Sequence, residues 1–420
     1  MVEAQEAVRL KKEQLLRPCT VVHFELGSAS AIAQSLEHDS HMTRNRTETL
    51  FCTMQYCQNG FNGLLEFEAP SRTLPEPQRF TCADLFSGCG GFSHGATLAK
   101  FVVKWAVEID PLSANAWRLN HPEGIMYIED IAQVINHMRQ GHDGYPCQGG
   151  LTMLGASSPC QGVSLQNATG GQNDDRNNKL VAAVGDVVDL IRPRYLVYEN
   201  VPGILQKAEG QCIFSNLVER LCLLGYQVMW KILNAADFGV PQDRNRVILV
   251  AAAPGNKLPT WPQPCGVSRR TVDEAFDGLP DEVGQEGPQY HDHNVSYNKP
   301  RSKMNEYAQE SRGSCDLLTS HVISNKDVAN WTSKPDRHKG KYPARTLLAT
   351  ESDRSSKLHP RMDRLLSVRE MARLQSFPDR YKFSGSVAEQ QKQVGNAVPP
   401  LLAKAVCDSI FRVLVGTSGE

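Results

Sequence analysis

The sequence Asp84-Leu85-Phe86-Ser87-Gly88-Cys89-Gly90-Gly91 gives the strongest indication of the fold. It completes an apolar run from Phe80 to Phe86, which is typical of a buried strand. Glycines directly after a strand allow a ligand to approach backbone N–H groups closely. The spacing is neither GxGxxG nor a P-loop, because no Gly-Lys-Ser/Thr follows. The stretch therefore predicts a strand followed by a ligand-binding turn, although a plain turn would share these features.

Length and composition limit the classes of protein to which this chain can belong. The chain has 420 residues, 40 % hydrophobic and 22 % charged, which suits two or three packed domains and excludes a wholly disordered chain. No run approaches the roughly 18 apolar residues of a membrane helix, and Met1 to Arg17 lacks the apolar core of a signal peptide, so we expect an intracellular protein. The scattered cysteines are expected to be thiols, with no metal site. The net charge of −1 disfavours a polybasic scaffold but permits a local basic stripe.

The chain divides into four regions. Residues 1–78 form a polar N-terminal extension of unknown role that ends in a Pro-containing linker. Residues 79–255 alternate short apolar runs with amphipathic segments, which predicts an α/β domain with a mostly parallel sheet. Residues 256–342 are richer in Pro, Gly, Asn and His and lose periodicity. Residues 343–420 regain helical patterns and should return to the packed domain.

Apolar runs predict the strands of this domain. They are Phe80–Phe86, Val102–Glu108, Ile125–Ile128, Leu151–Ala156, Tyr195–Tyr198, Gln227–Leu233 and Arg246–Ala252. Helical spacing of apolar residues from Leu180 to Ile191 predicts a helix that Pro193 ends. Two further helices are expected over Leu365–Gln375 and Leu401–Val413.

Polar residues follow five of the predicted strands. They are the glycine loop, Glu108-Ile109-Asp110, Glu129-Asp130, Ser158-Pro159-Cys160-Gln161 and Glu199-Asn200-Val201. Because the ends of parallel strands share one edge, where open α/β sheets bind ligands, these clusters should converge on one crevice. An acid after the second strand suits ribose hydroxyls, and one after the third suits an adenine amino group. A nucleoside-containing cofactor fits, while two solvated acids are the simpler interpretation.

Cys160, Glu199 and the segment Gln242–Arg246 are the candidates for chemistry. A thiol on a strand-end loop can act as a nucleophile, although most free cysteines are small buried hydrophobes. Glu199, one strand over, can donate a proton or a hydrogen bond in a substrate pocket, or can be an ion-paired strand-end acid. Arg244 and Arg246 favour contact with a phosphate or a carboxylate, with a solvated sheet edge as the alternative.

Together these residues resemble the cytosine-C5 DNA methyltransferases. The matching segments are Asp84–Gly91, Pro159-Cys160-Gln161, Glu199-Asn200-Val201, Gln242–Arg246, Arg369–Pro378 and Gly395–Pro400, in the family's order, and they span about 80 to 415. Ser158 departs mildly from the more common Pro-Pro-Cys-Gln. The stretch 251–259 and His359-Pro360 resemble eukaryotic members, including fungal ones.

The resemblance implies an S-adenosylmethionine-dependent, Rossmann-like fold of seven strands, one of them antiparallel, with a smaller irregular target-recognition region at 256–342. It assigns the cofactor to Phe86, Gly88, Gly90, Glu108, Ile109, Asp130, Ile131, Asn396 and Val398. Lys334, Arg337, Lys339, Lys341 and Arg345 form a basic stripe suited to phosphate contacts or to a solvated loop. Arg244 and Arg246 would position Glu199, the base or a nearby phosphate.

The implied reaction is methylation of C5 of a flipped-out cytosine in double-stranded DNA through a covalent Cys160 adduct. Three alternatives remain open: a tRNA cytosine-5 methyltransferase, a catalytically silent DNA-binding regulator, and a nucleotide-linked dehydrogenase, which would explain the glycine loop only. The expected location is the nucleus, or the cytoplasm of a bacterium, with a role in epigenetic regulation in the first case. The sequence identifies no protein partner.

Overall fold

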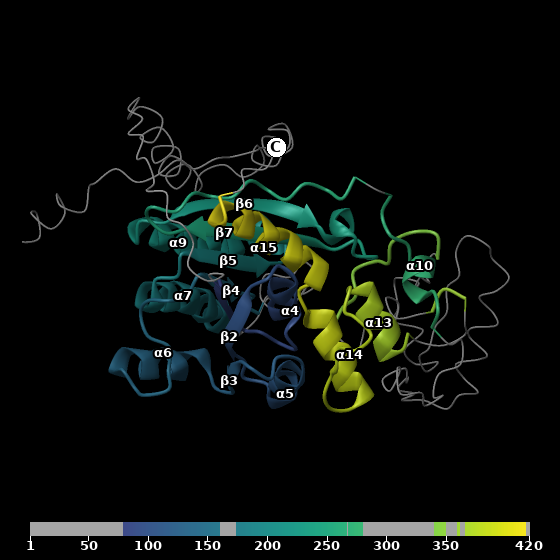
Figure 1. Cartoon of the computed structure of the whole chain (residues 1–420), viewed down its shortest axis with the longest axis horizontal. Coiled ribbons are helices and arrows are strands. Elements are labelled where there is room, and N and C mark those ends of the chain that lie inside the picture. The colour runs from purple at the N-terminus through teal and green to yellow at the C-terminus, as the bar shows by residue number, and fades with distance from the viewer. Residues whose placement is uncertain are drawn as a thin grey trace, which may run out of the picture.

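The computed structural model describes residues 79–159, 174–266, 268–279, 340–349, 359–361 and 366–416. Its centre is a seven-stranded sheet with the order β3-β2-β1-β4-β5-β7-β6 (Figure 1). The strands are β1 Thr81–Leu85, β2 Val102–Val107, β3 Ile125–Tyr127, β4 Met153–Ala156, β5 Tyr195–Asn200, β6 Gln227–Asn234 and β7 Asn245–Ala252. Strand β7 runs antiparallel to β5 and β6, and the other pairs are parallel. The predicted seven strands, with one antiparallel, are therefore confirmed.

Helices cover both faces of the sheet. They are α4 Gly91–Leu98, α5 Pro111–Asn120, α6 Ile131–Gln140, α7 Asp174–Ile191, α8 Gly203–Gln206, α9 Ala208–Leu223, η1 Ala235–Phe238, α10 Val272–Phe276, α13 Val368–Leu374, α14 Val387–Asn396 and α15 Pro400–Leu414. Figure 1 shows α6, α7 and α9 on one face, α4, α5 and α15 on the other, and α10, α13 and α14 gathered beyond one end of the sheet. The predicted helices at 180–191, 365–375 and 401–413 correspond to α7, α13 and α15.

Four apolar clusters hold these layers together, and the smallest of them packs Trp117 of α5 against β2 and β3. One lies between the sheet and helices α6, α7 and α9, and includes Leu154, Val184 and Leu217. The second lies beneath α4 and α15. The third joins α10, α13 and α14 through Phe276, Met371 and neighbouring residues. Burial of this apolar surface is the main favourable term in folding.

The region predicted as irregular packs in part against the α/β domain. Leu258 and Trp261 lie against the second cluster, and α10 contributes Val272 and Phe276 to the third. The bounds 256–342 remain a prediction, because residues 280–339 lie outside the described part of the chain. Residues 1–78, including Met1 to Arg17 and the cysteines among them, lie outside it as well. None of the helices that the structure describes is both long and apolar enough to cross a bilayer.

Candidate active site

The predicted polar clusters do meet at one edge of the sheet. Strands β1 to β5 are parallel to one another, so the glycine loop, Glu108, Asp130, Ser158-Pro159 and Glu199-Asn200 all lie at the carboxyl edge. Ligands of open α/β sheets bind at this edge. The structure therefore brings two groups of predicted site residues to the same part of the molecule. We call the glycine loop with Glu108 and Asp130 the cofactor side, and Ser158-Pro159 with Glu199 the chemical side.

The glycine loop adopts a backbone that requires its glycines. Gly88 and Gly90 have φ of 54° and 95°, in the left-handed region, and Phe86 shares it with φ of 55°. A Cβ on Gly90 would lie 2.7 Å from the hydroxyl of Tyr381, so the loop packs tightly on one side. A Cβ on Gly88 would meet nothing within 4 Å. The loop thus leaves open space beside Gly88, as a bound ligand would need.

Glu108 links the loop to the end of β2. Its Oε2 accepts a hydrogen bond from the backbone N–H of Gly88 at 2.7 Å, and its Oε1 accepts one from that of Asp110 at 2.9 Å. Burial raises the pKa of the Glu108 carboxyl, with the backbone hydrogen bonds opposing the rise. The neighbouring Ile109 is 56 % exposed and presents an apolar surface on which a flat ring can pack.

Asp130 and Ile131 follow β3 and begin helix α6. Asp130 is the N-cap, since its Oδ1 accepts from the N–H of Ala132 at 2.9 Å. Ile131 is only 5 % exposed, and its side chain belongs to the first apolar cluster. Its side chain is thus a core residue, so any contact of Ile131 with a cofactor would have to come from its backbone.

Residues 396–398 reach the glycine loop from the other end of the chain. Asn396 ends α14 with its side chain exposed, and Val398 is buried in the second cluster. A Cβ on Gly91 would lie 2.2 Å from the carbonyl oxygen of Val398, a distance that no real side chain accepts. Gly91 is therefore needed for this close approach, and the predicted cofactor residues from both ends of the chain lie together.

Asp84, at the start of the glycine motif, has a structural role that sequence reasoning did not assign. Its Oδ2 accepts from the N–H and the hydroxyl of Ser93, at 3.2 and 2.6 Å, and Trp117 Nε1 donates to that hydroxyl at 2.9 Å. Asp84 thereby caps helix α4 from a neighbouring strand. Burial raises its pKa to about 7, and its Oδ1 has no hydrogen-bond partner in the described part of the chain. No local sequence signal marks this pairing.

Glu199 and Arg246 form an ion pair at the chemical side of the edge. Glu199 is 8 % exposed, and its Oε1 lies 2.9 Å from Nε of Arg246 on the adjacent strand β7. Arg246 Nη1 also donates to the carbonyl of Asn245 at 2.7 Å. The predicted contact of this arginine with a carboxylate is therefore present, and it fixes the orientation of Glu199.

Asn200 anchors the loop that precedes the predicted nucleophile. Its Nδ2 donates to the hydroxyl of Tyr198 at 2.8 Å and to the carbonyl of Ser158 at 3.3 Å. The hydroxyls of Ser158 and Tyr198 are 2.9 Å apart. These bonds hold the end of β4, and so Pro159, against the end of β5. Cys160 itself lies outside the described residues, and its role stays a prediction.

Arg244 differs from its predicted surroundings. It is 2 % exposed, and its guanidinium donates to the carbonyls of Leu347, Gly395 and Ala397, at 3.1, 3.0 and 3.1 Å. These partners are backbone groups more than 100 residues away in the sequence. The alternative of a solvated sheet edge does not hold at this position, and Arg244 also lacks the surface exposure that a phosphate contact would need.

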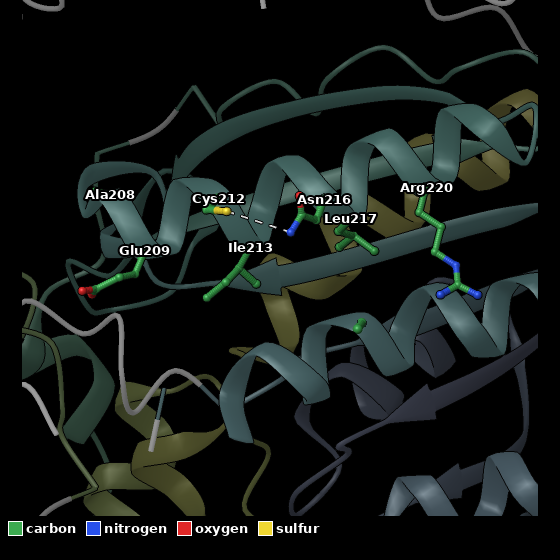
Figure 2. Close-up of a pocket in the computed structure, with 8 residues that line it drawn as sticks. Ala208, Glu209, Cys212, Ile213, Asn216, Leu217 and Arg220 are labelled. Carbon is green, nitrogen blue, oxygen red and sulfur yellow. Dashed lines mark hydrogen bonds between the residues drawn. The ribbon is translucent and has the colours of Figure 1, made fainter. Parts of the chain in front are cut away.

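A separate groove of about 540 Å³ lies between α7 and α9, lined by Ala182, Ala208, Glu209, Cys212, Ile213, Asn216, Leu217 and Arg220. Figure 2 shows the labelled side chains, Ala208 to Arg220, along α9, with the Arg220 side chain extending toward α7. Arg220 Nη2 pairs with Asp186 Oδ1 at 2.6 Å. Because no predicted site residue lines this groove, it is distinct from the strand-end site.

The fold and this site define a class. A seven-stranded sheet with antiparallel β7, a glycine loop after β1 and an acid after β2 is the arrangement that the resemblance to S-adenosylmethionine-dependent methyltransferases implied. The residues fit that cofactor, because Gly88 faces open space, Glu108 remains partly accessible and Ile109 offers an exposed apolar surface.

The comparisons with known proteins identify the family. The model of the C-5 cytosine-specific DNA methylase family matches residues 80–412, and the chain belongs to this family. With it come S-adenosylmethionine as the methyl donor and C5 of cytosine in DNA as the methyl acceptor.

Relatives come from bacteria and plants. The type II methyltransferase M1.HphI of Haemophilus parahaemolyticus is 31 % identical over 79 % of this chain and 87 % of its own length. The DNA (cytosine-5)-methyltransferase 3 of Arabidopsis thaliana is 27 % identical over 79 % of this chain, which spans only 31 % of that enzyme. A prophage protein of E. coli described as a DNA modification methyltransferase has a similar fold, with a TM-score of 0.59, 24 % identity and coverage of 80 % and 99 %.

Proposed function

We propose that this chain methylates C5 of a flipped-out cytosine in double-stranded DNA with Cys160 as the nucleophile and Glu199 as the group that activates the base. The observation that carries the proposal is the ion pair of Glu199 with Arg246 directly beside the anchored Ser158-Pro159 segment, from which the chain continues into Cys160. The target must leave the base stack, since no enzyme group can reach C6 inside a duplex.

Cys160, Glu199 and Arg246 each have a distinct role in the proposed reaction. Cytosine C5 is a poor nucleophile, and addition of the Cys160 thiolate to C6 makes the ring electron-rich at C5. Glu199 hydrogen-bonds N3 and the exocyclic amino group, and Arg246 holds its carboxyl in place through the 2.9 Å contact. When bound, S-adenosylmethionine supplies the electrophilic methyl group. Loss of the C5 proton then allows the thiolate to leave.

The cofactor side consists of the glycine loop and the residues that surround it. Glu108 would accept hydrogen bonds from ribose hydroxyls, and Ile109 would cover the adenine. Asp130 would accept from the adenine amino group. Phe86, Gly88 and Gly90 shape the loop, and Asn396 and Val398 close the site from α14.

The acceptor is tested by comparing DNA and RNA directly. Purified protein is incubated with methyl-labelled S-adenosylmethionine and either a mixed-sequence DNA duplex or tRNA, followed by base analysis. We expect 5-methylcytosine in the DNA, and none with Cys160→Ser. Label transferred only to tRNA would favour the tRNA enzyme, and no transfer to either acceptor despite DNA binding would favour the silent regulator.

The region 256–342 is proposed to read the target sequence, with Lys341, and Arg345 just beyond the region, among the phosphate contacts. Lys341 is exposed, and the segment that carries it is fixed by backbone bonds from Val272 and Asp273 to Tyr342 and Gly340. Lys334, Arg337 and Lys339 lie outside the described residues. Replacing Lys339 and Lys341 by Ala should reduce the salt slope of DNA binding by roughly one unit per lost phosphate contact. An unchanged slope would mean that the stripe faces solvent.

The proposed cellular location depends on the source organism. In a eukaryotic source, such as the plants that supply several of the relatives, the proposal places the protein in the nucleus with a role in epigenetic regulation. In a bacterium it places the protein in the cytoplasm, with DNA modification as its role. Microscopy of the tagged protein in cells of the source organism tests this point.

A further inference from the structure

The inward-facing side chains of the segment 242–246 serve two different parts of the molecule. Gln242, Arg244 and Arg246 are all buried, whereas Asp243 and Asn245 between them are exposed. Arg246 reaches Glu199 on the chemical side. Gln242 and Arg244 reach segments that are distant in the sequence. The motif therefore does more than orient a catalytic carboxyl.

Arg244 joins two segments through one cation. Its Nη1 donates to the carbonyl of Leu347, and its Nη2 donates to those of Gly395 and Ala397, all within 3.1 Å. Gln242 supports the first of these segments, since its Oε1 accepts from the N–H of Leu347 at 3.0 Å. Breaking charged hydrogen bonds to buried carbonyls leaves those groups without partners, which is strongly unfavourable.

The position of the guanidinium suits the end of helix α14. The last carbonyls of a helix have no partners within it, and the helix dipole makes this end negative, so a buried cation there satisfies both requirements. The two segments are also in direct contact. A Cβ on Gly395 would lie 2.9 Å from the backbone of Ala349, so the two segments are closely packed.

The residues that Arg244 holds lead directly into the cofactor side. Ala397 is followed by Val398, whose carbonyl oxygen would lie 2.2 Å from a Cβ on Gly91 of the glycine loop. Asn396, the exposed last residue of α14, lies between two of the carbonyls that Arg244 binds. A shift at Arg244 would therefore displace Asn396 and Val398 relative to the glycine loop.

We propose that Arg244 is a positioning residue for the cofactor: it holds Asn396–Val398 against the glycine loop and fixes the segment 344–347 in place relative to those residues. This inference rests on the proposed function, in which Asn396 and Val398 bound the cofactor site. It separates Arg244 from Arg246, two residues away, which acts on the chemical side through Glu199.

The test measures binding of S-adenosylhomocysteine, a non-reacting product, by calorimetry. Arg244→Lys keeps the charge but loses the forked contact to three carbonyls, and we expect the Kd to rise roughly 10- to 100-fold. With saturating S-adenosylmethionine, its kcat should recover to within about threefold of the wild type, because a positioning defect appears in KM rather than in the chemical step.

Two arginines serve as controls. Arg246→Lys should lower kcat and leave the Kd within about twofold, because its partner Glu199 lies on the chemical side. Arg373→Lys is the matched control: Arg373 also binds two carbonyls, of Ala275 and Asp277, and the carboxylate of Asp379, but none of these lies at the cofactor side. It should leave the Kd within about twofold, even if its thermal stability falls as much as that of Arg244→Lys.

Each outcome either supports or overturns the assignment of Arg244 as a positioning residue. A Kd for Arg244→Lys within twofold of the wild type, or an equal rise in Arg373→Lys, overturns the inference and leaves the proposed function intact. Should Arg244→Lys fail to fold, Gln375→Leu takes its place, because Gln375 Nε2 donates to the carbonyl of Val394 at 2.9 Å in the same helix end. That variant is expected to raise the Kd a few-fold, and an unchanged Kd would again overturn the inference. Wild-type protein that binds no S-adenosylhomocysteine would instead refute the proposed function.

Discussion

Nε of Arg246 lies 2.9 Å from Oε1 of Glu199, across the antiparallel pair of β7 and β5. Glu199 is opposite Ile248 in the register, so Arg246 is its diagonal neighbour on the adjacent strand. Both side chains are 10 % exposed. A carboxylate this far from water needs a charged partner, and the antiparallel direction of β7 supplies that partner at the carboxyl edge of the sheet.

Arg246→Met should be strongly destabilising. The substitution keeps much of the volume but leaves the Glu199 carboxylate without its partner, and breaking a buried pair in this way typically costs about 3–5 kcal/mol. Urea unfolding measures the loss. The double variant Glu199→Gln with Arg246→Met should regain part of the stability, because no unpaired charge remains. If the single variant were as stable as the wild type, the pair would not be the anchor that we describe.

Glu199→Gln should lower turnover far more than it lowers cofactor affinity. Glutamine keeps the size of the side chain, but it can neither carry the charge that pairs with Arg246 nor exchange a proton with the base. Assistance of this kind is typically worth about 10²- to 10⁴-fold in rate. Steady-state kinetics on DNA and calorimetry with S-adenosylhomocysteine separate the two effects. Full activity of the variant would remove Glu199 from the chemical step.

Gly91→Ala should weaken cofactor binding by at least about tenfold, because the added Cβ would lie 2.2 Å from the carbonyl oxygen of Val398 and must push residues 396–398 away from the glycine loop. Gly185→Ala in helix α7 is the control. Its Cβ would meet the side chain of Arg220, which can move aside on the protein surface. The control should bind S-adenosylhomocysteine like the wild type, and equal binding by Gly91→Ala would contradict the close packing.

Much of this architecture was predictable from the sequence, and the exceptions have physical causes. All seven strands were expected within about two residues, because buried strands appear as apolar runs. Strand β5 continues two residues beyond the predicted Tyr198, since polar Glu199 and Asn200 still pair with β7. Hydrogen bonds to distant groups escape such reasoning. The contacts of Arg244 with Gly395, 151 residues away, and of Asp84 with Ser93 leave no periodic pattern.

Asp84 should make the stability of this protein depend on pH between about 4 and 7. Burial raises its pKa from 3.8 to about 7, so the folded state holds a proton that the unfolded state has released in this range. The stabilisation is therefore complete below about pH 4 and is lost as the pH rises through about 7. Relative to Asp84→Asn, which cannot titrate, the wild type should lose about 2 to 3 kcal/mol between pH 5 and pH 8.

Urea unfolding of both proteins at pH 5, 6, 7 and 8 measures this difference. The comparison with Asp84→Asn cancels the contributions of other groups, among them His94 and His121, whose pKa values burial lowers to about 4. A constant difference between the two proteins across this range would mean that Asp84 stays ionised in the folded state.

The covalent step offers the most direct check on Cys160. DNA that carries 5-fluorocytosine at the target should become permanently attached to the protein in the presence of S-adenosylmethionine. Addition of the thiolate to C6 and arrival of the methyl group at C5 proceed as usual, but release requires the C5 substituent to leave as a cation. A proton can leave in this way and fluorine cannot, so the thioether persists on a denaturing gel with labelled DNA.

Cys160→Ser should abolish this attachment, because a hydroxyl is far less ionised and less nucleophilic than a thiol near neutral pH. Cys89→Ser and Cys147→Ser should still be attached. Cys89 is 1 % exposed and its pKa is raised by burial, so it is a poor nucleophile, and the exposed Cys147 lies before β4 and not after it. Attachment that survives the loss of Cys160 would overturn its assignment as the nucleophile. No attachment in any variant, with DNA and cofactor binding demonstrated, would favour a catalytically silent DNA-binding regulator.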